Sequence, residues 1–105
     1  MTDTLLSTQE NTDVDTGTET VATVSTTYYD GAFFDYVAKD GTNYRAGTVM
    51  AVWDGSSVQY ADNSTADIGD TSGVTLAVDI NGTDARLRAT TTSDNWNIKA
   101  FVRAL

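Results

Sequence analysis

The chain of 105 residues has no cysteine, no histidine and no proline. Without cysteine it can form neither a disulfide nor a thiolate metal site. Without histidine it lacks the commonest general base and the commonest transition-metal ligand. A catalytic triad of the usual serine or cysteine type therefore cannot be assembled, and we expect that the protein is not an enzyme. The absence of proline removes one of the residues that protect the edge strands of a sheet.

Basic residues are scarce: six Lys and Arg stand against fifteen Asp and Glu, a formal net charge of −9. Nucleic-acid binding needs clustered bases, and an anionic membrane surface repels such a chain. No apolar run approaches the roughly 20 residues that span a bilayer, and the first residues lack the pattern of a signal peptide. We therefore expect a soluble chain, made in the cytoplasm, with no nucleic-acid partner, no membrane partner and no cofactor.

Segments rich in valine, threonine and aromatic side chains, which favour strands, make up most of the chain. Asp-Gly and Asn-Gly dipeptides separate several of them, and these readily form tight turns. No segment has the 3.6-residue period of a helix, so we predict an all-β, antiparallel β-sandwich or jelly-roll-like domain. The dipeptides are Asp30-Gly31, Asp40-Gly41, Asp54-Gly55 and Asn81-Gly82. The expected strands are 21–29, 32–39, 44–53, 57–61, 74–80, 85–90 and 96–103.

Two patterns within these strands predict which faces are buried. The last three strands alternate apolar and polar residues, which predicts a meander with one solvated face and places Trp96 in the core beside Ile98. Residues 46–53 carry no charge on either face. Such a run predicts a strand that is covered on both sides, either centrally in the sheet or against another subunit.

The first 20 residues differ from the rest, with seven threonines, five acidic side chains and no base. So little apolar surface cannot offset the entropy of ordering the segment alone. We therefore expect a polar, acidic N-terminal arm over residues 1–20, followed by a β-sandwich domain over residues 21–105. The arm is either disordered or ordered against a neighbouring subunit, and its removal is expected to leave the body folded.

Two groups of residues are candidates for contacts between subunits. Apolar side chains of the arm could anchor it, and an outward row of bases on the last two strands could receive its acidic residues. Ordinary solvated surface is the alternative explanation of the basic row, since exposed ion pairs contribute at most about 1 kcal/mol each. The residues are Leu5, Leu6 and Val14 in the arm, and Arg86, Arg88, Lys99 and Arg103 in the body.

Two further sites are conceivable. The polar loop after residue 61 contains several hard oxygen donors of the kind that Ca²⁺ prefers, although turn formation explains the same residues and the spacing differs from an EF-hand. Exposed aromatic rings beside aspartate could bind carbohydrate. The candidate calcium ligands are Asp62, Asn63, Asp67 and Asp70, and the candidate glycan-binding residues are Trp53, Asp54 and Tyr60.

Four segments resemble the small β-domains of tailed-bacteriophage virion structural proteins, the type found in capsid decoration proteins, head fibres and tail fibres. They are FDYVAKDGTNYRAGTV (34–49), VWDG (52–55), DIGDTS (67–72) and ARLRA (85–89). The resemblance covers roughly residues 25–105 and brings no catalytic residues with it.

The resemblance implies a structural protein of the virion that decorates or stabilises the capsid. Its partners would be the major capsid protein or other virion subunits, and further copies of the chain, with a trimer favoured. The alternative that the resemblance leaves open is a tail-fibre, baseplate or neck module that binds host-surface carbohydrate.

Overall fold

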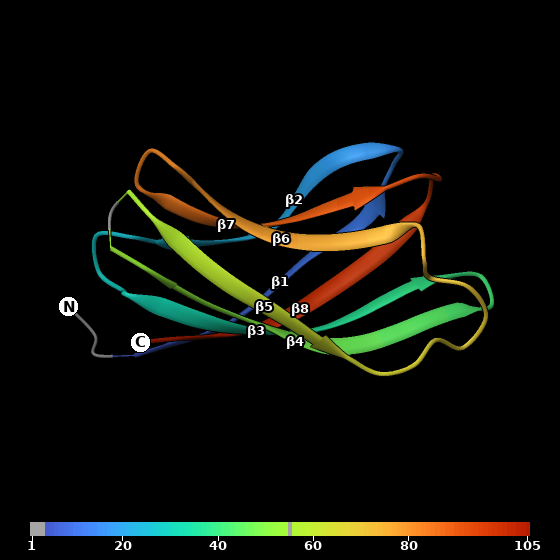
Figure 1. The fold of residues 1–105 in the computed structure, drawn as a ribbon, viewed down its shortest axis with the longest axis horizontal. Helices are drawn as coiled ribbons and strands as arrows, with labels where there is room; N and C mark the ends of the chain where they lie inside the picture. Colours follow the sequence, from blue (N-terminus) through green and yellow to red (C-terminus); the bar gives the residue numbers. More distant parts are fainter. Residues whose placement is uncertain (1–3, 55) are drawn as a thin grey trace.

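The described part of the chain folds into eight antiparallel strands in two facing sheets (Figure 1), so the expectation of an all-β sandwich is confirmed. A computed structural model describes residues 4–54 and 56–105. The first three residues of the predicted arm, and Gly55 of the predicted Asp54-Gly55 turn, lie outside the described residues. The strands are β1 (Leu5–Val14), β2 (Gly17–Ser25), β3 (Gly31–Asp40), β4 (Asn43–Trp53), β5 (Val58–Ser64), β6 (Val74–Asn81), β7 (Asp84–Thr91) and β8 (Trp96–Ala104).

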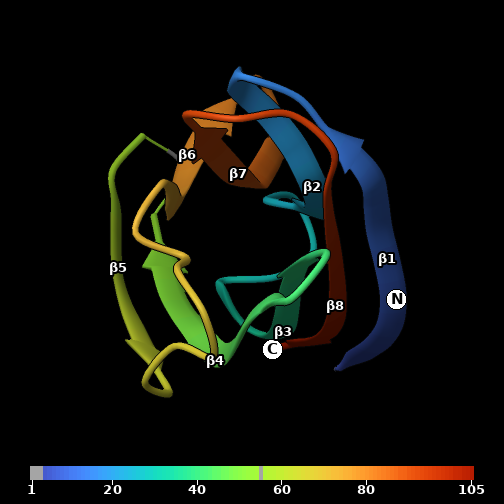
Figure 2. The ribbon, with the colours of Figure 1, turned by 90° about the vertical axis from the view of Figure 1, so that its right-hand side faces the viewer.

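The large sheet has the strand order β1-β8-β3-β4-β5, and the small sheet has the order β2-β7-β6. The first strand thus pairs with the last and the second with the seventh, a jelly-roll-like wrapping of the chain. Along the long axis (Figure 2), the five strands run around one side of the molecule and the three strands close the other. In the part of the chain that the structure describes, no helix is long and apolar enough to cross a membrane.

Two of the four predicted turn dipeptides contribute to two-residue hairpin loops. Gly41 and Gly82 have φ angles of 60° and 61° and each takes the first of the two loop positions in a hairpin, β3–β4 and β6–β7. Glycine suits this position because residues with a side chain rarely adopt the left-handed backbone conformation. The Asp30-Gly31 dipeptide has another role, since the chain passes there from the small sheet to the large one.

The predicted arm is not an arm, because residues 5–14 form strand β1 and β2 begins at Gly17. Strand β1 pairs with β8 from Leu5 opposite Ala104 to Val14 opposite Trp96. The expected domain boundary at residue 21 therefore falls inside a strand of the sandwich.

Polar side chains of β1 are ordered because the neighbouring strand β2 satisfies them. The Gln9 amide nitrogen donates to the Thr23 carbonyl and its amide oxygen accepts from the Thr23 backbone N–H, both at 2.9 Å. Asn11 in the same way donates to the Thr20 carbonyl at 3.2 Å. These bonds, together with the backbone ladder to β8, hold in place a segment whose apolar content is low.

The last three strands do not form the predicted meander. Strands β6 and β7 pair as a hairpin, but β8 crosses to the large sheet and lies between β1 and β3. The crossover passes through Asn95, which has a φ of 71° and donates its backbone N–H to the Asp15 carboxylate at 3.2 Å. The predicted inward faces nevertheless hold, because both sheets face the same core.

The core lies between the two sheets and contains inward side chains of both. Phe34 and Ile98 of the large sheet and Leu87 of the small one are fully buried, and Trp96 is buried as predicted. Of the predicted inward residues in the last three strands, only Ile80 is incompletely buried.

Candidate binding face

The large sheet has one side against the core and one side uncovered, which we call the outer face. Residues that lie opposite one another on neighbouring strands form rows across the five strands of this face. The first row is Leu6, Arg103, Phe33, Met50 and Ala61, and the second is Thr8, Phe101, Asp35, Thr48 and Asn63. The third begins Glu10, Lys99, Val37 and Ala46.

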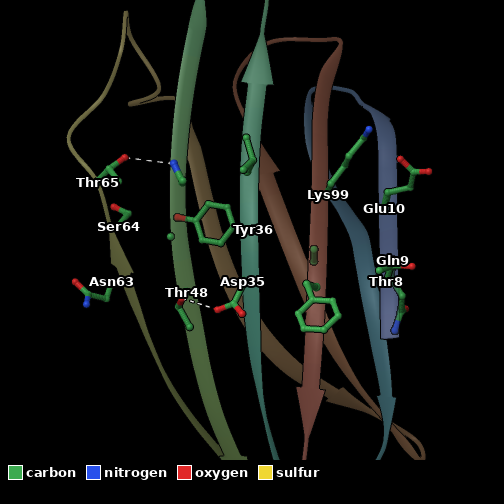
Figure 3. A pocket seen from close by; sticks show the side chains of 15 residues that line it. Thr8, Gln9, Glu10, Asp35, Tyr36, Thr48, Asn63, Ser64, Thr65 and Lys99 are labelled. Atoms are coloured by element: carbon green, nitrogen blue, oxygen red, sulfur yellow. Dashed lines mark hydrogen bonds between the residues drawn. The ribbon is translucent and has the colours of Figure 1, made fainter. Parts of the chain in front are cut away.

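A groove of about 930 Å³ crosses the outer face over all five strands (Figure 3). Several lining side chains on β3 and β4 are short, among them Asp35, Ala46 and Thr48, and they leave room between β8 and the edge strand β5. Hydroxyl, amide and charged groups surround this centre. They belong to Thr8, Gln9, Glu10, Asn63, Ser64, Thr65 and Lys99.

A smaller hollow of about 390 Å³ is predominantly apolar and includes Phe33, Met50 and Val52. Met50 is 43% exposed and Val52 is 58% exposed, whereas Val49 and Trp53 of the same strand are buried. The uncharged run 46–53 is therefore central in its sheet, as predicted, but the described chain covers only one of its two sides. Its outward residues form an exposed apolar surface.

One ion pair stands in the middle of the outer face. The Arg103 guanidinium Nε lies 3.2 Å from the Asp35 carboxylate, and its carbon lies 4.9 Å from the centre of the Phe33 ring. Asp35 also accepts a hydrogen bond from the Thr48 hydroxyl at 2.7 Å. The pair joins β8 to β3 beside the Phe33 ring.

Beneath the groove, a buried tyrosine fixes the positions of β3, β4 and β5. The Tyr36 hydroxyl donates to the Asp62 carboxylate at 2.9 Å and accepts from Arg45 Nε at 3.2 Å. Burial raises the pKa of Tyr36 above its ordinary value. Arg45 continues to the carbonyl oxygens of Thr71 and Val74, and so holds the loop that follows β5 against the sheet.

The four candidate calcium ligands are not brought together as a metal site. Asp62 is bound to Tyr36, and Asn63 lines the groove. Asp67 accepts hydrogen bonds from the Thr71 backbone and hydroxyl, Asp70 accepts from Ser72 in the same way, and these bonds lower the pKa of both carboxyls. Within residues 4–54 and 56–105, no group of three or more acidic side chains is placed to hold a metal ion.

The candidate glycan residues do not form a platform. Trp53 is 5% exposed and its indole N–H donates to the Tyr29 carbonyl at 2.6 Å, so its ring belongs to the core. Asp54 accepts from the Ser57 backbone N–H at 2.9 Å and stabilises the turn after β4. Tyr60 is exposed and lines the smaller hollow.

The predicted basic row is divided between the two sheets, because β7 and β8 are not neighbours. Arg86 and Arg88 lie on the small sheet, where Arg86 Nε contacts Asp79 at 2.8 Å. Lys99 and Arg103 lie on the outer face of the large sheet. The row is therefore not a single docking surface.

The predicted anchors of the arm have different positions in the fold. Val14 is fully buried, and Leu5 packs against the core, so both serve folding. Leu6 is 69% exposed and lies on the outer face beside Arg103. Only this member of the three is available for contact with another molecule.

Sequence reasoning missed that Phe33, Met50 and Phe101 share one exposed surface. The signals were present: residues 46–53 carry no charge, and alternation points Phe101 away from the core. What the sequence does not reveal is that β8 stands next to β3, which brings Phe101 beside Asp35 and close to Phe33 and Met50.

These features define a two-sheet β-sandwich with one uncovered, partly apolar sheet face. No protein-family model matches the chain, and no curated protein matches it. Among solved structures, the chain is similar to the tailspike protein of Acinetobacter phage vB_ApiP_P1, with a TM-score of 0.56 and 17% sequence identity. The match covers 95% of this chain and 22% of the tailspike chain. At this identity the likeness concerns the fold, and the chain spans about a fifth of the tailspike's length.

Proposed function

We propose that the protein is a non-enzymatic structural module of a tailed-phage virion, which works by contact with other subunits. The observation that carries the proposal is the likeness of 95% of the chain to part of a phage tailspike. The virion-type motifs at 34–49, 52–55, 67–72 and 85–89 support it independently. The uncovered outer face supplies a surface on which such contacts can form.

A position in the tail is better supported than one on the capsid. The sequence predicted an N-terminal arm that could attach the module to a neighbouring subunit of the capsid, but residues 5–14 are a strand of the large sheet. The structural likeness is to a tail protein. We therefore place the module in a tail spike or fibre.

The test is to locate the protein in purified phage particles. Tails and heads of the phage that encodes the chain would be separated, and the copies of the protein in each fraction counted by quantitative mass spectrometry. A small number of copies in the tail fraction is expected. Hundreds of copies on the head would instead mean capsid decoration, and absence from the particle would contradict the structural role itself.

Carbohydrate binding is a second candidate function, and one observation favours it. The groove surrounds the exposed Phe101 ring with hydroxyl and amide groups and with the carboxylates of Glu10 and Asp35, which suit stacking and hydrogen bonding to a sugar. The test is binding of the protein to an array of bacterial surface oligosaccharides, with Phe101→Ala as the control variant. An array that stays blank with the wild-type protein would contradict this candidate.

A further inference from the structure

We propose that the outer face of the large sheet is covered by a second copy of the same chain, so that the protein is a homo-oligomer assembled sheet against sheet. The proposal deepens the proposed function, because it names the partner of the surface on which that function depends. Three properties of the described residues carry it: the apolar character of the face, its charge and its area.

The two sheets differ sharply in what they present to solvent. On the outer face, Leu6, Val37 and Phe101 are 69%, 48% and 41% exposed, in addition to the exposed Met50 and Val52. The solvent side of the small sheet instead carries threonine, aspartate and arginine. Its residues are Thr18, Thr20 and Thr23 of β2, Thr75, Ala77 and Asp79 of β6, and Arg86, Arg88 and Thr90 of β7.

The difference in exposed residues indicates that the polar side of the small sheet faces water, whereas the outer face of the large sheet contacts another molecule. Exposed apolar side chains gathered on one surface mark an interaction site more often than scattered ones do. The small sheet, with strands of eight or nine residues, shows that this chain can make a polar solvent face. The apolar outer face is therefore a property of that surface and not of the whole composition.

Charge on the outer face distinguishes a second copy from other partners. The chain has a net charge of −9, but among the residues that the structure describes the paired rows of the outer face carry three bases, Lys39, Lys99 and Arg103, against two acids, Glu10 and Asp35. Two acidic molecules repel each other least when they meet through surfaces on which positive and negative charges are close to balanced. The two signs also alternate across the face, with Glu10 opposite Lys99 and Asp35 paired with Arg103, so one copy can meet bases with acids on the other.

The area of the outer face matches what a protein partner needs. Five strands of about nine residues, spaced about 4.8 Å apart with a rise of about 3.3 Å per residue, give a sheet of roughly 24 by 30 Å, or about 700 Å². Stable protein interfaces bury about 800 Å² on each partner. A second sheet would cover this face, whereas a short saccharide in the groove would leave Met50 and Val52 in water.

The experiment measures the mass of the full chain in solution. Light scattering on a sizing column, from about 1 to 200 µM protein, is expected to give a multiple of 11.2 kDa for the wild-type chain. In the double variant Met50→Lys and Val52→Lys, buried ammonium groups would oppose the contact, and we expect a monomer. The control variant Thr75→Lys and Thr90→Lys adds the same charges to the small sheet and should stay oligomeric.

Both double variants make the molecule less negative by the same amount. A difference in their oligomeric state therefore reflects the sheet on which the lysines stand and not the net charge. Far-UV circular dichroism and urea unfolding check that each variant is folded. A wild-type chain that stays monomeric up to 200 µM overturns the proposal, as does a folded Met50→Lys, Val52→Lys variant that remains oligomeric. Binding of a bacterial oligosaccharide to a monomeric wild-type chain would assign the face to that ligand instead.

A second measurement keeps the proposal testable if the lysine variants do not fold. The chain has no cysteine, so Met50→Cys and Thr75→Cys each place a single thiol on one sheet. The Met50→Cys thiol is expected to react with maleimide at least tenfold more slowly at 200 µM than at 1 µM protein, while the Thr75→Cys thiol reacts equally at both. Equal rates for both variants would overturn the proposal.

Failure of this proposal can be distinguished from failure of the proposed function. A monomer in solution that is nevertheless found in the phage tail would leave the structural role intact and assign the outer face to a different subunit. An oligomer that is absent from the particle would leave the interface intact and remove the role in the virion.

Discussion

At Gly47 the missing side chain makes room for a buried aromatic ring. A β-carbon at this position would lie 2.8 Å from the Tyr36 hydroxyl and 2.8 Å from the Asn63 carbonyl oxygen, closer than such atoms approach in proteins. The ring can therefore lie across the opposite strand and reach Asp62 and Arg45. One residue on β4 thus sets the hydrogen bonds that join three strands below the groove.

Replacing Gly47 by alanine is expected to destabilise the protein by about 1–3 kcal/mol, the usual cost of overpacking a closely packed site. The added methyl group has to displace the Tyr36 ring or the backbone of β5. The free energy of unfolding in urea measures this cost. Thr75→Ala, at an exposed strand position, is the matched control and should change stability by less than about 0.5 kcal/mol. Equal stability of the two variants would mean that the Tyr36 contact is not constrained.

At the scale of elements, the edge strand β1 is ordered by its contacts with β8 and β2. It pairs with β8 at eight positions in the large sheet, and its Gln9 and Asn11 side chains bond to the backbone of β2. Val14 at its end is completely buried in the core. The segment that composition marks as an arm therefore belongs to the folding unit.

Removal of residues 1–20 is expected to abolish cooperative unfolding instead of leaving a folded body. The deletion exposes the edge of β8, removes Val14 from the core and takes away half of β2. Urea unfolding followed by tryptophan fluorescence, together with dye binding to exposed apolar surface, measures the effect. Leu6→Thr, which changes an exposed residue of the same strand, should unfold cooperatively like the wild type. A cooperative transition in the deletion variant would restore the arm as an independent segment.

The corner between β1 and β2 concentrates negative charge. The neighbouring Asp15 carboxylate raises the pKa of Asp13, and Glu19 and Asp94 add to the effect. A raised pKa in the folded state means that the ionised form of Asp13 opposes folding at neutral pH. The opposite holds for Asp67, whose pKa is lowered by hydrogen bonds from Thr71.

Asp13→Asn is therefore expected to raise the melting temperature at pH 7 and low salt. The gain should shrink as the pH falls through the raised pKa of the folded state, and disappear below the unfolded value of 3.8, where Asp13 is protonated in both states. Asp67→Asn should act with the opposite sign, because its stabilisation is present above 3.8 and lost as the pH falls through its lower folded pKa. Melting curves between pH 2.5 and pH 7 test both; a change of the same sign in the two variants would contradict the assignment.

At the scale of the whole molecule, charge and apolar surface are distributed unequally. Of the fourteen acidic residues that the structure describes, only Glu10 and Asp35 stand in the paired rows of the outer face, while half of the six bases do. Two copies in contact through this face would still repel one another through the rest of their surfaces. That repulsion is long-ranged, and salt screens it.

The proposed oligomer is therefore expected to become tighter as salt increases. Between about 10 mM and 150 mM NaCl the Debye length falls from about 30 Å to about 8 Å, which screens distant charges but leaves apolar contacts unchanged. Sedimentation equilibrium at the two salt concentrations measures the dissociation constant. Weaker association at the higher salt concentration would show that ion pairs, and not the apolar residues, dominate the interface.

The positions of the strands along the chain are easier to predict than the order of the strands in the sheets. Alternation of side chains correctly identified the inward faces of β6, β7 and β8, because the two-residue period is a local property of any half-buried strand. The same alternation cannot reveal which strand becomes the neighbour. Lys99 and Arg86 were therefore placed in one row although they lie on different sheets.

The sequence by itself determined an all-β fold, the approximate places of seven strands, two hairpin turns at Gly41 and Gly82, and the burial of Trp96. These depend on residues that are close along the chain. Only the tertiary structure decided that β1 is ordered, that β8 lies in the large sheet, that Trp53 is buried, and that one sheet face stays apolar and exposed. The physical reason is that each of these depends on backbone pairing and packing between segments far apart in sequence, which no local pattern encodes.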